Sequence, residues 1–181
     1  MHIVITGQKQ VGKSTLVRKI TEDLLKENNR IKIYGLETKK ETERKDDAGN
    51  TPVYIYEIEK PRIQSEKNLA GFVSGIKGRT VVHTDVFDSY APVLERFAEH
   101  ADLIVIDEIG FMESKSELFC KAVLKLLEGD VPVLAVVRNQ DTPFLNSVRN
   151  HSNCQCFYVT EENRDWIESE IKKALPGRTF L

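Results

Sequence analysis

The chain has 181 residues, a hydrophobic fraction of 40% and a formal net charge of −2. This size and composition predict a single domain over residues 1–181, and the small net charge favours neither nucleic acid nor a membrane surface as a partner. No apolar run approaches the roughly 18 residues of a membrane-spanning helix, and no signal peptide is expected before the first strand. Cys120, Cys154 and Cys156 lack the spacing of a disulfide or zinc framework, which indicates a reducing, cytoplasmic location.

A phosphate-binding loop follows the first strand of the chain. The apolar, β-branched run from His2 to Thr6 predicts this strand, and apolar residues at helical spacing predict a helix from about Lys13 to Asn28. Between them the sequence reads G-x-x-x-x-G-K-[ST], the Walker A pattern of a P-loop. The nucleotide-binding residues predicted here are Gly7, Gln8, Lys9, Gln10, Val11, Gly12, Lys13, Ser14 and Thr15.

The residue types of this loop suit a nucleoside triphosphate bound with Mg²⁺. Gly7 and Gly12 allow a tight bend and a close approach to an anion, because they carry no Cβ. The loop N–H groups and the N-terminus of the following helix favour phosphate. Lys13 is expected to reach the β- and γ-phosphates, and the Ser14 hydroxyl is expected to ligate Mg²⁺. Lys9 either adds charge near the γ-phosphate or is solvated.

A segment rich in strand patterns and poor in helix patterns spans about residues 31–78. Ile31–Thr38 and Val53–Ile58 read as strands, and the charged run Lys39–Asn50 between them reads as a loop. These two strands are expected to form an antiparallel hairpin or ribbon around the charged tip. The three glycines of Leu69–Gly78 predict irregular backbone. This β-rich excursion is expected to lie beside the nucleotide site.

Strands and helices alternate through the rest of the chain. Further strands are predicted at Thr80–Thr84, Leu103–Ile106, Val131–Val137 and Phe157–Val159. Cys154 and Cys156 are interpreted as ordinary thiols on opposite faces of a strand. Helices are predicted at Phe87–Ala101, around Leu118–Leu127, at Phe144–Asn150 and at Arg164–Ala174. This alternation indicates parallel crossovers, and the fold class is therefore a three-layer α/β P-loop domain with a mostly parallel central sheet.

The second half of the predicted phosphate site follows the apolar strand Leu103–Ile106. Asp107 is the expected Mg²⁺ ligand, and Glu108 is the expected catalytic group that orients water. Arg138 ends the next buried strand and is the candidate for a catalytic arginine, with a solvated strand end as the alternative. Residues 107–110 also fit D-x-x-G of GTPase switches, but the chain lacks the N-K-x-D sequence that would support guanine specificity.

Two stretches resemble a known family. The run from Asp102 to Glu113 (DLIVIDEIGFME) resembles the Walker B signature of the cancer-related nucleoside-triphosphatase family, and Thr160–Arg164 is similar to its T-x-E-N-R stretch. Gly78 and the residues after it resemble the segment before the family's Walker B helix. The chain departs from the family in its P-loop, where Gln8-Lys9-Gln10 replaces Pro-Pro-Gly, and at Phe111, where the family often has proline.

The resemblance implies a Mg²⁺-dependent enzyme that hydrolyses ATP, GTP and other nucleoside triphosphates to the diphosphate and phosphate. Arg164 starts the last helix and is the candidate for a contact near the base. Glu113 is expected to brace the loop after Walker B. Two alternatives stay open: a kinase that passes the γ-phosphate to a nucleotide or small molecule, and a nucleotide-dependent switch with little turnover.

Overall fold

The structure, a computed structural model, describes residues 1–75 and 79–175. The strands are β1 (His2–Gly7), β2 (Ile33–Lys40), β3 (Thr51–Glu57), β4 (Leu69–Val73), β5 (Thr80–Val82), β6 (Leu103–Ile109), β7 (Val133–Val137) and β8 (Cys154–Val159). The helices are α1 (Lys13–Glu27), α2 (Thr84–His100), α3 (Glu117–Glu128), α4 (Pro143–Arg149) and α5 (Arg164–Ala174). Short 3-10 turns occur at Glu66–Asn68 and Glu113–Lys115.

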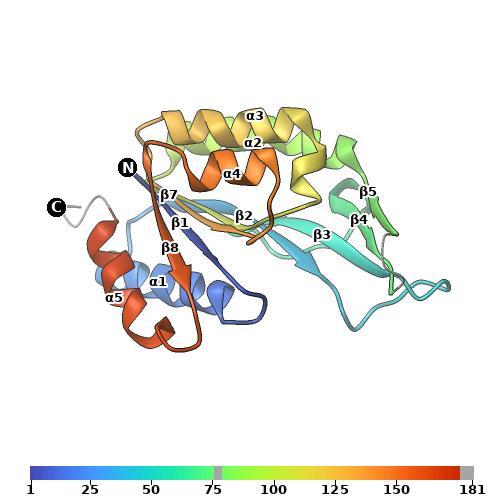
Figure 1. The fold of residues 1–181 in the computed structure, drawn as a ribbon. Coiled ribbons are helices and arrows are strands. Elements are labelled where there is room, and N and C mark those ends of the chain that lie inside the picture. The colour runs from blue at the N-terminus through green and yellow to red at the C-terminus, as the bar shows by residue number, and fades with distance from the viewer. Residues whose placement is uncertain (76–78, 176–181) are drawn as a thin grey trace.

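One mixed sheet runs through the described part of the chain in the order β5-β4-β3-β2-β6-β7-β1-β8. Strands β2, β6, β7, β1 and β8 are parallel, whereas β2–β3, β3–β4 and β4–β5 pair antiparallel. Helices α2, α3 and α4 cover one face of the sheet, and α1 and α5 cover the other (Figure 1). The predicted three-layer α/β architecture with its β-rich excursion is confirmed, and β2 and β3 form the predicted hairpin.

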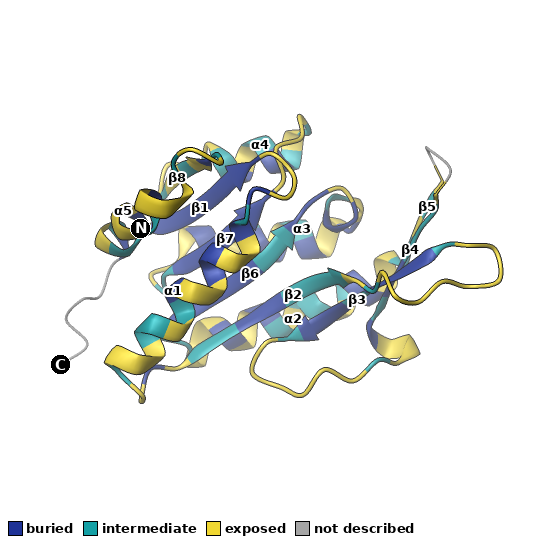
Figure 2. Cartoon of the chain, turned by 90° about the horizontal axis from the view of Figure 1, so that it is seen from below, coloured by how far each residue is buried: buried dark blue, intermediate teal, exposed yellow. Residues whose placement is uncertain are grey.

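Strand β1 divides its apolar side chains between the two layers. Val4 belongs to the core under α2, α3 and α4, whereas Ile3 and Ile5 belong to the core under α1 and α5. Side chains alternate along a strand, so an unbroken apolar run is buried on both faces. Figure 2 shows the central strands buried, with exposed residues on the outer helix surfaces and in the β2–β3 loop.

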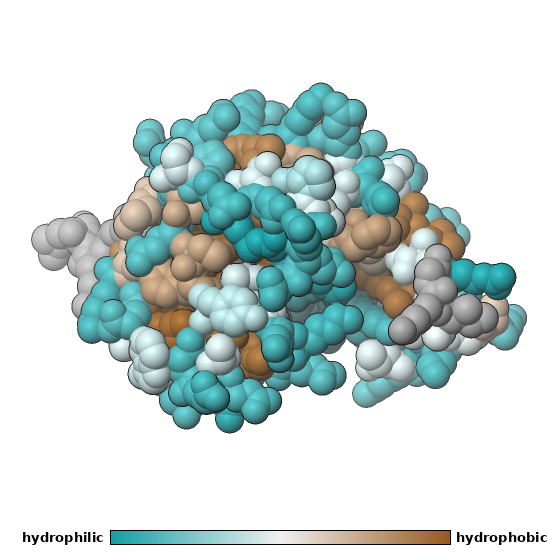
Figure 3. Space-filling model, viewed as in Figure 1, coloured by the Kyte–Doolittle hydropathy of each residue, from teal (hydrophilic) through white to brown (hydrophobic). Residues whose placement is uncertain are grey.

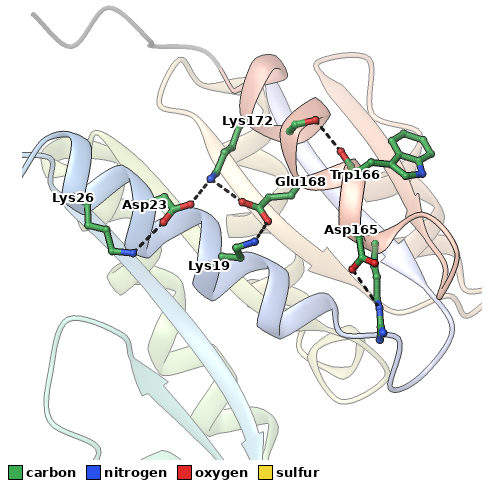
Figure 4. A network of polar contacts seen from close by, with 9 residues as sticks. Lys19, Asp23, Lys26, Asp165, Trp166, Glu168 and Lys172 are labelled. Atoms are coloured by element: carbon green, nitrogen blue, oxygen red, sulfur yellow. Dashed lines mark hydrogen bonds and ion pairs between the residues drawn. The ribbon is translucent and has the colours of Figure 1, made fainter.

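A network of charged side chains joins α1 to α5 (Figure 4). Lys172 on α5 contacts Asp23 on α1, and it also lies 2.8 Å from Glu168 one turn earlier. Lys19 on α1 reaches the same Glu168 carboxylate at 2.6 Å. The Lys172 side chain is only 19% exposed, so its ion pairs are less screened than those on the open surface. This network supports the position of the helix that follows the P-loop.

The expectation of irregular backbone after Leu69 is wrong, because residues 69–73 form β4. Gly71 has φ +143°, and a Cβ there would lie 2.0 Å from the carbonyl oxygen of Val81. Glycine therefore permits the close pairing of β4 with β5, which a side chain would block. Gly78, part of the same prediction, lies outside the described residues.

Several element boundaries and one side-chain placement differ from expectation. The strand predicted at Thr80–Thr84 ends at Val82. The helix predicted from Phe87 begins at Thr84, because His83 is its N-cap residue and Asp85 occupies its acidic first turn. Strand β8 begins at Cys154, because it pairs with β1 from His2 onward, and β2 extends to Lys40 beside β3. Cys154 and Cys156 lie two positions apart in one strand and therefore share a face, which corrects the expectation of opposite faces.

Candidate functional site

The P-loop connects β1 to α1 through two glycines in positive-φ backbone. Gly7 has φ +147°, and a Cβ there would lie 2.3 Å from the carbonyl oxygen of Val159 on the neighbouring strand. Gly12 has φ +95° and is the N-cap of α1, which begins at Lys13 as predicted. Side chains are strained in this region of backbone, so both positions favour glycine.

Lys13 lies over the loop with its ammonium group held by backbone. Its Nζ donates to the carbonyl oxygen of Gly7 at 3.2 Å and to that of Gln8 at 2.6 Å. Burial lowers the pKa of Lys13, while the nearby Glu108 carboxylate acts in the opposite direction. Lys13 is 7% exposed, so its ammonium group is a largely buried cation within the loop.

Ser14 and Asp107 come together at the start of α1. The Ser14 hydroxyl donates a hydrogen bond of 3.0 Å to Oδ1 of Asp107. Burial raises the pKa of Asp107 to about 6, and the Ser14 hydrogen bond partly opposes this shift. Within the described residues no cluster of three or more histidine, cysteine or acidic side chains could hold a metal ion. The two oxygen donors nevertheless fit Mg²⁺, which binds one or two protein oxygens and completes its shell with phosphate oxygens and water.

Glu108 and Arg138 form an ion pair at the carboxyl ends of β6 and β7. Arg149 on α4 fixes the backbone beside this pair, since its guanidinium donates to the carbonyl oxygens of Arg138 and, at 2.6 Å, of Gln140. Gly110 leaves room for the arginine, because a Cβ at that position would lie 2.8 Å from Cδ of Arg138. The adjacent strands thus place one anionic and one cationic group at the same sheet edge.

Glu113 braces the loop after β6, as expected from the sequence. Its side chain is 4% exposed, and Oε2 accepts the N–H of Gly110 at 2.8 Å. The Thr38 side chain on β2 also hydrogen-bonds this carboxyl group, whose pKa is raised by burial. The brace therefore connects the residues after Walker B to the strand beside β6.

A cavity of about 440 Å³ lies over the P-loop. It gathers most of the predicted site residues, and its lining consists of Lys9, Gln10, Gly12, Lys13, Ser14, Thr15, Glu108 and Arg138. Asp107 adjoins it through Ser14 and lines a neighbouring cavity of about 340 Å³. Figure 3 shows this side of the molecule hollowed, with hydrophilic residues over its middle.

Four predicted nucleotide-binding residues lie outside the lining of this cavity: Gly7, Gln8, Val11 and Arg164. Gln8 contributes the carbonyl oxygen that holds Lys13, and Val11 is 5% exposed and packs in the core under α1. Arg164 begins α5, with its side chain 55% exposed and 3.7 Å from Asp165. Its contact with the base stays a prediction.

Arg149 and Lys40 were not identified from the sequence. Arg149 is the last residue of a short helix, and no motif marks the two carbonyl oxygens that it holds. Lys40 belongs to a charge run that reads as solvated, yet it lines a cavity next to the P-loop. The alternation of β2 would have placed Lys40 on the same face as Thr38, but only the tertiary structure shows what that face adjoins.

Known proteins resemble this chain over nearly its whole length. A family model described as NTPase matches residues 2–172. Nucleoside-triphosphatase THEP1 of Methanosarcina barkeri is 33% identical, over 94% of this chain and 95% of its own. The crystal structure of THEP1 from Aquifex aeolicus matches with a TM-score of 0.75 and 30% identity, over 97% of this chain and 99% of that chain.

The solution structure of a human cancer-related nucleoside triphosphatase matches with a TM-score of 0.69 and 26% identity, over 96% of both chains. No described helix has the length and apolarity needed to cross a membrane. The family resemblance inferred from the run between Asp102 and Glu113 is confirmed by these matches. The chain belongs to the NTPase family.

Proposed function

We propose that this protein is a Mg²⁺-dependent cytoplasmic enzyme that hydrolyses ATP, GTP and other nucleoside triphosphates to the diphosphate and phosphate. The observation that carries this proposal is the cavity over the P-loop, which joins Lys13 and Ser14 to Glu108 and Arg138. Relatives with similar sequences along nearly the whole chain are named nucleoside-triphosphatases, which supports the same chemistry.

The P-loop and Lys13 bind the triphosphate in this proposal. Backbone N–H groups of the loop and the N-terminus of α1 favour negative charge. Lys13 exchanges its contacts with the carbonyl oxygens of Gly7 and Gln8 for contacts with β- and γ-phosphate oxygens. Phosphoryl transfer depends mainly on positioning and on neutralising charge, and a largely buried lysine supplies both.

Ser14 and Asp107 would hold Mg²⁺, Ser14 directly and Asp107 through water. The metal supplies positive charge to the β- and γ-phosphate oxygens when it is bound. Ser14 must then turn its hydroxyl lone pairs to the metal while it still donates to Asp107, which the 3.0 Å hydrogen bond allows. The ionised form of Asp107 accepts this hydrogen bond more strongly than the neutral form, and it favours a cation.

Glu108 and Arg138 act on the γ-phosphate side. The Glu108 carboxylate orients the attacking water and accepts its proton, since it borders the cavity that takes the phosphates. Arg138 neutralises charge that develops on the transferred group, and its ion pair with Glu108 holds both side chains in place before the substrate arrives. Arg164 is assigned to the base end of the nucleotide.

Phosphate release from ATP, GTP, CTP and UTP with Mg²⁺, and without any organic acceptor, tests this function. The wild-type protein is expected to release phosphate, and Glu108→Gln is expected to lose at least tenfold in kcat, since general-base catalysis contributes about 10²–10⁴. Glu43→Gln, an exposed residue of the β2–β3 loop, is the matched control. Wild-type protein that binds nucleotide without releasing phosphate would refute the hydrolase function.

A further inference from the structure

A second cavity lies directly beyond the predicted catalytic pair. Its volume is about 310 Å³, and it lies between the β-rich excursion and the loop after β6. Lys9, Glu108 and Arg138 line both this cavity and the one over the P-loop. The two cavities therefore adjoin on the side where the γ-phosphate of a P-loop nucleotide is expected. We call the second one the outer cavity.

The outer cavity is larger than hydrolysis requires. One water molecule occupies about 30 Å³ in the liquid, so the nucleophile of a hydrolase needs roughly a tenth of this space. Pockets for small organic ligands begin at about 300 Å³. The size of the outer cavity thus corresponds to a small organic molecule placed next to Glu108.

Positive charge exceeds negative charge around the outer cavity. Arg138 and Glu108 line it as an ion pair, so their charges offset each other. Lys9 and Lys40 remain as two cations, and no ion pair within the described residues engages either lysine. The other acidic residue, Glu113, is buried, and burial favours its neutral form. The lining therefore suits an anionic ligand.

Apolar side chains form the other part of the lining. Val53, Val73 and Met112 line it from the excursion and from the loop after β6, together with the partly exposed ring of Phe111. Apolar residues also gather at the β4–β5 end of the molecule in Figure 3. The neutral polar groups are Thr38, Thr80 and Gln140. Such a surface accommodates a flat apolar ring, with a few polar groups to orient it.

We propose that the outer cavity binds a phosphoryl acceptor, a small anion that carries a flat apolar ring and a free oxygen nucleophile, and that the protein transfers the γ-phosphoryl group to it. This inference rests on the proposed binding of a nucleoside triphosphate over the P-loop. It adds an organic acceptor to water as the group that receives the phosphoryl. A mononucleotide has the required size and negative charge, and its flat base offers apolar faces to Val53, Val73 and Met112 and polar edges to Thr38, Thr80 and Gln140.

The transfer step balances with the groups that the two cavities hold. An oxygen of the acceptor bonds to the γ-phosphorus, and the bond from that phosphorus to the bridging oxygen of the β-phosphate breaks. The nucleoside diphosphate leaves with the electron pair of that bond. Where the nucleophile is a hydroxyl, its proton passes to the Glu108 carboxylate and then to solvent. No oxidant or reductant is required.

The test uses ATP labelled at the γ-phosphate, Mg²⁺ and full-length protein, with nucleoside 5′-monophosphates as probes and the corresponding nucleosides as uncharged counterparts. Labelled organic product and free labelled phosphate are separated and counted. Label is expected in the monophosphates and at least tenfold less in the nucleosides, because the cationic lining recognises the anion. Absence of labelled organic product from every monophosphate overturns the proposal, whether or not a probe binds.

Two adjacent lysines provide a matched pair of variants. Lys40 lines the outer cavity, whereas Lys39 lines the cavity on the other face of the sheet. Lys40→Ala is expected to lower the ratio of transfer to hydrolysis about tenfold, by removing a charge-assisted contact, and Lys39→Ala is expected to leave this ratio unchanged. Equal effects of the two variants overturn the assignment to the outer cavity. Phosphate release without a probe measures the hydrolase function separately, so the two failures are distinguishable.

Discussion

The Ser14 hydroxyl donates a 3.0 Å hydrogen bond to the carboxylate of Asp107, across a sequence separation of 93 residues. This contact joins the start of α1 to the end of β6 and so connects the Walker A and Walker B segments. Burial raises the pKa of Asp107 to about 6, and the serine hydroxyl partly opposes this shift because its hydrogen bond stabilises the ionised carboxylate.

Replacing Asp107 by alanine should weaken Mg²⁺ binding. We expect the Mg²⁺ concentration for half-maximal phosphate release to rise about 10–100-fold. Losses of this size are typical when a group that binds the metal through water or through another ligand is removed. A Mg²⁺ titration at saturating ATP measures this shift. Asp130→Ala, at an exposed position before β7, is the control, and identical titrations for the two variants would remove Asp107 from the metal site.

Replacing Arg138 by alanine should lower kcat by more than tenfold. An arginine that reaches the transferred phosphoryl group contributes about 10³–10⁵ in rate, and this variant also removes the partner of Glu108. Steady-state phosphate release gives kcat, and Arg138→Lys is expected to recover part of the loss. Arg30→Ala, at an exposed position after α1, is the control. A change in kcat below threefold for Arg138→Ala would show that this residue is only a solvated strand end.

Replacing Gly7 by alanine should destabilise the protein. The new Cβ would lie 2.3 Å from the carbonyl oxygen of Val159, so β1 and β8 must separate. Gly49→Ala is the control for a glycine at positive φ without a close contact, since its φ is +76° and a Cβ there meets no atom within 4 Å. We expect Gly7→Ala to lose about 1–3 kcal/mol more than Gly49→Ala in urea unfolding. Equal losses would mean that the close approach has no energetic consequence.

Replacing Glu113 by glutamine should alter how stability depends on pH. Burial raises the pKa of Glu113 in the folded protein above its ordinary value of 4.5. The stabilisation from its proton is therefore complete below about pH 4.5 and is lost as pH rises through the folded pKa. Each pH unit between the ordinary and the folded pKa corresponds to about 1.4 kcal/mol of this stabilisation. Glutamine does not ionise, so the stability of the variant should not decrease in this way as pH rises.

Thermal unfolding from pH 4.5 to pH 8 measures the effect of Glu113→Gln. The wild-type protein should lose stability relative to the variant as pH rises, while Glu43→Gln in the exposed loop should follow the wild type. Parallel curves for wild type and Glu113→Gln would show that this carboxyl group keeps the same proton affinity in the folded and unfolded states.

The structural elements that depend on a few neighbouring residues could be predicted from local sequence patterns. The P-loop and the start of α1 at Lys13 follow from the spacing of Gly7 and Gly12, because backbone freedom and helix capping act within one turn. The unbroken apolarity before Asp107 predicted a buried strand, and its place between two parallel neighbours confirms it. The β2–β3 hairpin was likewise predicted from strand patterns on both sides of a charged loop.

Contacts between residues far apart in the sequence determined the remaining features of the fold and the site. Gly71 suggested irregular backbone, whereas the close approach of Val81 makes it part of β4. The pairing of Glu108 with Arg138 depends on the order of β6 and β7 in the sheet, which residue periodicity alone does not specify. The fold class and the phosphate-binding segments can be read from the residues, because they depend on local backbone preferences and apolar patterns. Which distant side chains share a cavity follows from the packing between layers, and so it becomes visible in the folded chain alone.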